Sequence, residues 1–125
     1  MVLCTNAIAQ HAALAALTES QATIEDMRSK YERRRNVLIN GLQRLGFRIQ
    51  APKGAFYAYA NISELGLCGL EVAKRLARDA KVLAYPGTAF TYDNSGEDYV
   101  RFSYTSSTAK LQTAIDRMEK VVNSL

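Results

Sequence analysis

Arg101 is the residue whose type and position most directly suggest chemistry. It lies in the middle of residues 99–104, YVRFSY, whose alternation predicts a β-strand with Arg101 on one face and Val100 and Phe102 on the other. A partly desolvated guanidinium needs a partner, because burying an unpaired charge is costly. Arg101 can lie on a solvated strand face, pair with an internal carboxylate, or bind an anion. The anion-binding alternative is chemically specific, since the planar guanidinium fits carboxylates and phosphates in a bidentate way.

The remaining motifs give weaker signals. Two turns lie beside aromatic residues, in PKGAFY (52–57) and YPGTAF (85–90), and such turns usually only connect elements. His11 is the only histidine, which leaves few acid–base or metal-binding schemes. No segment has the glycine pattern of a phosphate-binding loop, and Cys4 and Cys68 lack metal-ligand spacing. The sequence therefore predicts no metal site.

The elements that position Arg101 follow from hydrophobic periodicity and turn residues. Helices are predicted over residues 6–17, 23–45 and 70–80 and from 107 almost to the end, and extended segments over 47–50, 56–62, 82–85 and 99–104. Asn6 is expected to cap the first helix and Gly46 to end the second. The order predicts an α/β (α+β) layered domain, a small sheet packed by helices, preceded by a short helix and a long interdomain helix.

Composition and charge limit the function classes. Of the 125 residues, 48% are apolar and 22% charged, which is typical of a globular chain with one core. The net charge of +4 is modest for a nucleic-acid-binding surface, and residues 33–35, RRR, are expected to form a solvated helix face. No stretch has the roughly 18 apolar residues of a membrane span. The two cysteines favour reduced thiols and a cytoplasmic location.

In their order and spacing, these signals resemble a known family. The segments APKGAFYAYANI (51–62), AKVLAYPGTAF (80–90) and DYVRFSYTSSTAKLQTAIDRMEKV (98–121) are similar to the C-terminal domain of class I and II, fold-type I, pyridoxal-phosphate-dependent aminotransferases. The resemblance is closest to prokaryotic aspartate aminotransferases. It covers essentially the whole chain, because residues 7–17 and 31–35 also resemble helical segments of this family.

The resemblance implies a domain division and a reaction. Residues 1–30 would be the end of a large domain and the first part of the interdomain helix, and residues 31–125 the small C-terminal domain. The reaction would transfer an amino group between an amino acid and a 2-oxo acid, with Arg101 binding the substrate α-carboxylate. The family also places near the substrate entrance the residues that match Gly54, Phe56, Tyr57 and Phe90.

The implied cofactor is pyridoxal 5′-phosphate, which needs a lysine for its Schiff base. None of the six lysines stands in the family's Ser-x-x-Lys context. We therefore expect the catalytic lysine and the other cofactor-binding residues upstream of this chain, and expect this chain to be inactive alone. The implied partners are the amino acid and 2-oxo acid substrates, the missing large domain and a second subunit of a homodimer, with no nucleic acid and no membrane. The uncharged stretch before Glu19 predicts that the isolated chain self-associates through residues 7–17 and the upper part of the long helix.

Two alternatives remain open from the residues. The chain can be a non-catalytic interaction module that kept the fold without the chemistry. It can also be an RNA-binding module, because residues 53–59, KGAFYAY, resemble the Lys-Gly-aromatic strand of RNA-recognition domains. Ala55, however, stands where that strand needs a stacking ring.

Overall fold

The chain divides into two compact units, Met1–Lys30 and Tyr31–Leu125. The structure, a computed structural model, describes residues 4–124. Helix α2 (Ala22–Arg44) contributes to both units. The assignment of these units to a large and a small aminotransferase domain stays a prediction.

The first unit is built on helix α1 (Ala7–Thr18). The side chain of Asn6 accepts a hydrogen bond from the backbone N–H of Ala9 at 2.8 Å, so Asn6 is the helix cap that the sequence predicts. No residue of α1 is buried. Ile8 and Leu17 are 83% and 82% exposed.

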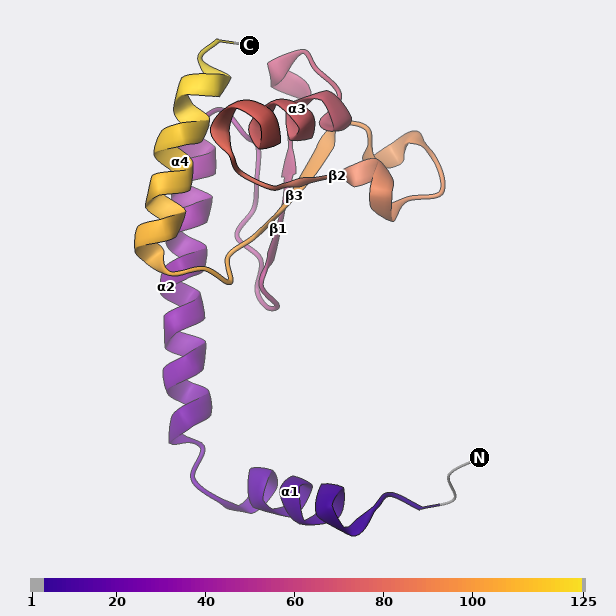
Figure 1. Ribbon diagram of the computed structural model, residues 1–125, viewed down its shortest axis with the longest axis vertical. Coiled ribbons are helices and arrows are strands. Elements are labelled where there is room, and N and C mark those ends of the chain that lie inside the picture. Colours follow the sequence, from indigo (N-terminus) through magenta and orange to yellow (C-terminus); the bar gives the residue numbers. More distant parts are fainter. Residues whose placement is uncertain (1–3, 125) are drawn as a thin grey trace. The chain divides into compact units, whose positions relative to one another are not determined.

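The second unit holds a three-stranded antiparallel sheet in the order β1-β3-β2. Its strands and helices, besides the end of α2, are β1 (Tyr57–Asn61), α3 (Gly69–Arg75), β2 (Tyr85–Pro86), β3 (Tyr99–Ser103) and α4 (Thr108–Val122). The C-terminal part of α2 and helix α4 lie side by side next to the sheet (Figure 1). This arrangement confirms the predicted α/β (α+β) class.

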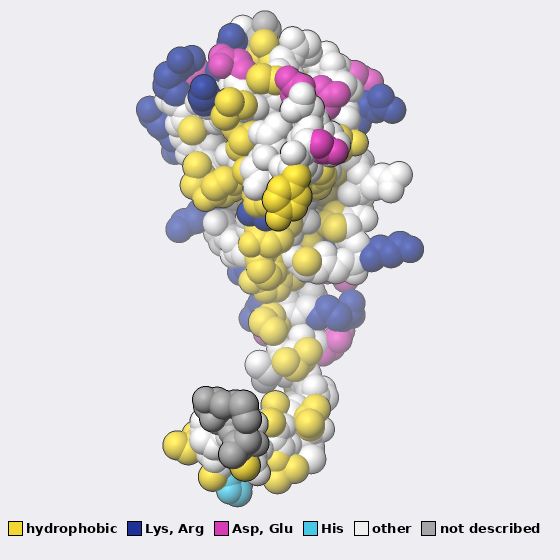
Figure 2. All heavy atoms as spheres, turned by 90° about the vertical axis from the view of Figure 1, so that its right-hand side faces the viewer, with side chains coloured by type: hydrophobic (Ala, Val, Ile, Leu, Met, Phe, Trp, Pro, Cys, Tyr) yellow, Lys and Arg dark blue, Asp and Glu magenta, His cyan; other side chains and the backbone are white. Residues whose placement is uncertain are grey.

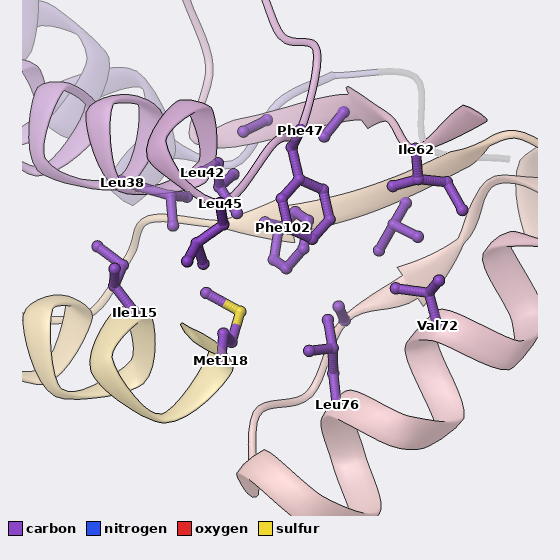
Figure 3. Packing of buried hydrophobic residues seen from close by; sticks show 14 of the residues in the cluster. Leu38, Leu42, Leu45, Phe47, Ile62, Val72, Leu76, Phe102, Ile115 and Met118 are labelled. Atoms are coloured by element: carbon purple, nitrogen blue, oxygen red, sulfur yellow. The ribbon is translucent and has the colours of Figure 1, made fainter. Parts of the chain in front are cut away.

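The core lies between the helices and one face of the sheet. Figure 3 shows buried side chains from α2, α3, α4 and the sheet pointing toward one another. Phe47 and Phe102 meet edge to face, with ring centroids 5.7 Å apart. Gly41 lets α2 approach α4 closely, because a Cβ at this position would overlap the side chain of Ile115.

The sheet alternates as the sequence predicts. Ala58, Ala60, Val100 and Phe102 face the core and are buried. The side chains between them point the other way and form a surface that we call the outer sheet face, which consists of Tyr57, Tyr59, Asn61, Tyr85, Tyr99, Arg101 and Ser103. Strand alternation therefore places Arg101 on an aromatic surface opposite the core.

Three local predictions need correction. Residues 82–85 do not form a strand: the N–H of Val82 donates to the Leu76 carbonyl to close the preceding helix, so pairing starts only at Tyr85. Residues 47–50 contribute a single bridge, Arg48 to Asn61. The helix predicted over 70–80 is α3 followed by one π-helical turn, Leu76–Ala80, which ends at Lys81 with φ 57°.

The expected solvated face of residues 33–35 is also wrong for two of the three arginines. The Arg34 guanidinium donates to the Thr105 carbonyl at 3.0 Å, and the Arg35 guanidinium donates to the Pro52 carbonyl at 3.2 Å. Both side chains are half-buried. Each guanidinium holds α2 against a loop of the second unit by donating to a backbone oxygen, and Arg35 also pairs with Glu32 on the same helix.

Candidate functional site

Arg101 lies between aromatic rings on the outer sheet face. Its guanidinium carbon is 4.2 Å from the centre of the Tyr57 ring and 3.8 Å from the centre of the Phe90 ring. A third ring, that of Tyr85, is 5.6 Å away. Tyr57 comes from β1 and Phe90 follows β2, the two strands that flank Arg101 in the sheet. The rings therefore reach the guanidinium from both neighbouring strands and attract it through cation–π contacts.

The guanidinium has no anionic partner in the part of the chain that the structure describes. No carboxylate of residues 4–124 lies within ion-pair distance of Arg101, and no hydrogen bond uses its guanidinium donors. The side chain is half-buried. The sequence left three alternatives open for Arg101. The absence of a nearby carboxylate among residues 4–124 argues against an internal ion pair, and the half-buried side chain argues against a fully solvated face. The N–H donors, which lie in the guanidinium plane, stay available to a bound anion.

A groove borders Arg101 along the outer sheet face. Its volume is about 320 Å³, within the range of small-molecule sites. The groove is lined by Phe56, Tyr57, Leu83, Tyr85, Arg101, Phe102, Ser103 and Thr105. Figure 2 shows that hydrophobic side chains gather on the side of the second unit turned away from α2 and α4. Aromatic rings thus surround the guanidinium itself, while the groove beside it also offers the hydroxyl groups of Ser103 and Thr105.

The structure brings most of the predicted site residues together. Tyr57 and Phe90 contact Arg101, and the Phe56 ring lies 4.6 Å from the Tyr57 ring and lines the groove. Gly54 lies farther back, in the turn before β1, where its carbonyl faces the Tyr104 hydroxyl at 3.4 Å. The substrate contacts of these residues stay a prediction of the family resemblance.

Sequence reasoning missed Tyr85. This residue pairs with Arg101 in the β2–β3 register, and its ring supports Phe90 edge to face at 6.4 Å. The signal was available in principle, because any residue opposite Arg101 in an adjacent strand shares its face. Finding it needed the register of a two-residue strand, which the sequence does not specify.

The loop that carries Phe90 is closed by two glycines. Gly87 and Gly96 are buried, and a Cβ on either one would overlap main-chain atoms of the other. The Tyr59 hydroxyl also packs against Gly87. Such close backbone contact requires glycine on both sides. The loop therefore presents Phe90 to Arg101 from a fixed base.

Tyr59 and Tyr99 stack beside this loop, with ring centroids 4.8 Å apart and an interplanar angle of 5°. Burial raises the pKa of Tyr59, and the neighbouring Tyr99 raises it further. The Tyr59 hydroxyl is thus neutral at physiological pH. Arg101 is therefore not paired with a Tyr59 tyrosinate.

The described residues do not fit the demands of pyridoxal phosphate. All six lysines are solvent-exposed, namely Lys30, Lys53, Lys74, Lys81, Lys110 and Lys120. A Schiff-base lysine is activated by a desolvated or cationic pocket, which none of these positions supplies. Within residues 4–124, no cluster of histidine, cysteine and acidic side chains could hold a metal ion. The same residues include no helix with the length and apolar character to cross a membrane.

Comparison with known proteins identifies the family. The family described as "Aminotransferase class I and II" matches residues 1–118, so the chain belongs to this family. The chain is 41% identical to aromatic-amino-acid aminotransferase 2 of Thermococcus litoralis and 40% identical to the aspartate aminotransferase of Pyrococcus abyssi, in each case over 95% of this chain and 31% of the relative. The structure of Thermus thermophilus aspartate aminotransferase with maleate matches with a TM-score of 0.79 and 38% identity, over 91% of this chain and 29% of that chain.

These matches confirm the resemblance to aminotransferases, including aspartate aminotransferases, and the fold that it implies. The chain spans about 31% of the length of the curated relatives that it matches. No feature of residues 4–124 supports the RNA-binding alternative over the family that the comparisons identify.

Proposed function

We propose that this chain forms the part of a pyridoxal-phosphate-dependent aminotransferase that binds the substrate α-carboxylate. The overall reaction transfers an amino group between an amino acid and a 2-oxo acid. The observation that carries the proposal is Arg101, a half-buried guanidinium held between aromatic rings with no carboxylate of residues 4–124 beside it. Membership of the aminotransferase family supports the same assignment.

The role of Arg101 follows from the shape of its side chain. A carboxylate in the guanidinium plane accepts two parallel hydrogen bonds, which fixes both its position and its rotation. Tyr57 and Phe90 contact the guanidinium and limit the orientations of its plane. Holding the substrate in one orientation can lower the barrier by several kcal/mol, because reacting groups then meet without a further loss of rotational freedom.

The cofactor is proposed to bind residues outside this chain. Pyridoxal phosphate supplies the electron sink of amino-group transfer, but the exposed lysines described above do not fit its attachment. The catalytic lysine is proposed to come from the large domain of the same enzyme, and a homodimer is the proposed assembly. The isolated chain is then inactive. The free thiols of Cys4 and Cys68 agree with the proposed cytoplasmic location.

The proposed substrates are acidic or aromatic amino acids with their 2-oxo acids. Two relatives are named for aspartate and for aromatic amino acids, and both align with 95% of this chain. Phe56, Tyr57 and Phe90 are proposed to stand near the substrate entrance, and Gly54 to shape the turn that carries the first two.

A chimeric enzyme tests this proposal. The homologous segment of the Thermococcus litoralis relative is replaced by this chain, and the purified protein is assayed with aspartate or phenylalanine and 2-oxoglutarate. We expect the chimera to bind pyridoxal phosphate, seen by its absorbance, and to transaminate. A folded chimera that binds the cofactor but transfers no amino group from any tested amino acid would contradict the proposal.

A further inference from the structure

The turn before β1 holds a residue in an unusual backbone conformation. Ala55 has φ 59°, in the left-handed region that favours glycine, because a side chain there crowds the backbone. A non-glycine residue keeps this conformation only where its surroundings enforce it. The turn leads directly into Phe56 and Tyr57, and the Tyr57 ring lies against the Arg101 guanidinium.

Tyr104 supplies the enforcing contacts. Its hydroxyl donates to the Ala55 carbonyl at 3.0 Å and lies 3.4 Å from the Gly54 carbonyl. Its backbone N–H donates to the Phe56 carbonyl at 3.0 Å. The Tyr104 side chain is only 2% exposed, and its ring packs edge to face on Tyr31 with centroids 6.4 Å apart. Because core packing restricts the ring, the core sets the position of its hydroxyl. The hydroxyl can therefore hold the turn in place.

A second contact fixes the start of the same turn. The Arg35 guanidinium donates to the Pro52 carbonyl at 3.2 Å from helix α2. The turn is therefore held at Pro52 by a helix and at Ala55 by Tyr104. Only the Tyr104 contact lies next to the strained residue.

We infer that the Tyr104 hydroxyl is a positioning group for Arg101, acting through the turn at Ala55 and the ring of Tyr57. This inference rests on the proposed function, in which Arg101 binds a carboxylate. Arg101 and Tyr104 lie on the same extended segment, Arg101 facing the outer sheet face and Tyr104 the core. The same segment thus carries the Arg101 guanidinium and, through Tyr104, holds the turn that positions the Tyr57 ring.

Removing the hydroxyl alone separates this role from core packing. Tyr104→Phe keeps the buried ring but leaves the Ala55 carbonyl without its donor. The strained turn then relaxes, and the Tyr57 ring loses its fixed place over the guanidinium. We expect the guanidinium to sample more orientations and to bind carboxylates more weakly.

The experiment uses nuclear magnetic resonance on the full 125-residue chain. The Arg101 Nε–H resonance reports ring contact, because stacked aromatic rings shift nearby protons upfield. Maleate, a small dicarboxylate, is titrated as the probe. Tyr104→Phe is compared with Tyr92→Phe, a matched control at a fully exposed tyrosine. We expect Tyr104→Phe, but not the control, to reduce the upfield shift and to raise the maleate Kd about threefold or more.

A second variant removes the ring directly and keeps the test independent of core stability. Tyr57→Leu lies on the exposed outer sheet face and should reproduce both effects. If Tyr104 acts through Tyr57, the double variant is no weaker in maleate binding than Tyr57→Leu alone. Additive losses in the double variant would overturn the inference, because the hydroxyl would then act by another route.

The outcomes separate the inference from the proposed function. If wild type binds maleate at Arg101 and Tyr104→Phe changes neither the shift nor the Kd, the positioning role is wrong while the proposed function stands. If maleate leaves Arg101 of the wild type unperturbed, the carboxylate-binding role fails in this chain, and the inference that rests on it falls too.

Discussion

Gly87 and Gly96 touch backbone to backbone, and a Cβ added to either would overlap main-chain atoms of the other. This contact closes the loop whose Phe90 ring lies 3.8 Å from the Arg101 guanidinium. Main-chain atoms cannot move aside as a flexible side chain can. The packing of two glycines therefore supports one wall of the candidate site.

Replacing Gly87 by alanine should open this loop. We expect Gly87→Ala to lower the free energy of unfolding by about 1–3 kcal/mol, the usual cost of overpacking. The measurement is urea unfolding followed by circular dichroism. Gly54→Ala is the matched control, because a Cβ at Gly54 would meet no atom within 4 Å. A Gly87→Ala midpoint equal to that of the control would contradict the role of the glycine contact.

Replacing Ala55 by glycine should stabilise the chain. The left-handed conformation of Ala55 costs about 1–2 kcal/mol, which glycine would avoid. The greater conformational freedom of glycine in the unfolded state offsets about 0.5–1 kcal/mol of this stabilisation. We expect a net stabilisation of about 0.5–1 kcal/mol in urea unfolding. Ala109→Gly, at an exposed position of α4, should have the opposite sign. A destabilising Ala55→Gly would show that the turn is unstrained.

Alkaline pH should destabilise the chain through its shielded tyrosines. Burial raises the pKa of Tyr104 above its ordinary value of 10.0. Because the pKa in the folded state exceeds that in the unfolded state, this contribution to stability is fully present below the unfolded pKa. It is lost as the pH rises through the folded pKa. The free energy of unfolding should therefore fall with pH above about 10 in the wild type.

Tyr104→Phe isolates this contribution. The variant starts less stable because the Ala55 carbonyl loses its donor, but its stability should fall less steeply above about pH 10. Urea unfolding at several alkaline pH values gives the slopes. Equal slopes for Tyr104→Phe and wild type would mean that Tyr104 ionises as freely when folded as when unfolded.

Helix α1 should make the isolated chain self-associate. Its exposed apolar residues include Ile8, Leu14 and Leu17, and no residue of the helix is buried. Sedimentation velocity should show a concentration-dependent increase in mass, reduced by Leu17→Glu. Leu70→Glu, at another exposed leucine, is the control. A clean wild-type monomer at high concentration would count against this prediction.

Much of the fold is readable from the sequence because the signals are local. Asn6 and Ser107 both cap helices through their side chains, and Gly46 ends α2 with φ 85°. Strand alternation alone places Arg101 opposite the side that Val100 occupies. Periodicity and capping act over a few residues, so sequence patterns record them.

The parts that could not be predicted depend on distant contacts. Tyr104 reads as a core residue by alternation, yet its hydroxyl anchors a turn about 50 positions earlier in the chain. Arg34 and Arg35 read as surface charges, yet both donate to carbonyls of distant loops. Every residue has a backbone carbonyl, so the residue types do not indicate which carbonyl will accept a side-chain hydrogen bond.

The account depends most on Arg101 binding the substrate carboxylate. Arg101→Lys in the chimeric enzyme keeps the charge but loses the bidentate geometry. We predict a fall in kcat/KM for the amino acid of at least tenfold, or about 1.4 kcal/mol of transition-state stabilisation. Arg117→Lys, at an exposed arginine of α4, is the control and should leave kcat/KM unchanged. Equal kcat/KM values for wild type and Arg101→Lys would contradict the assignment.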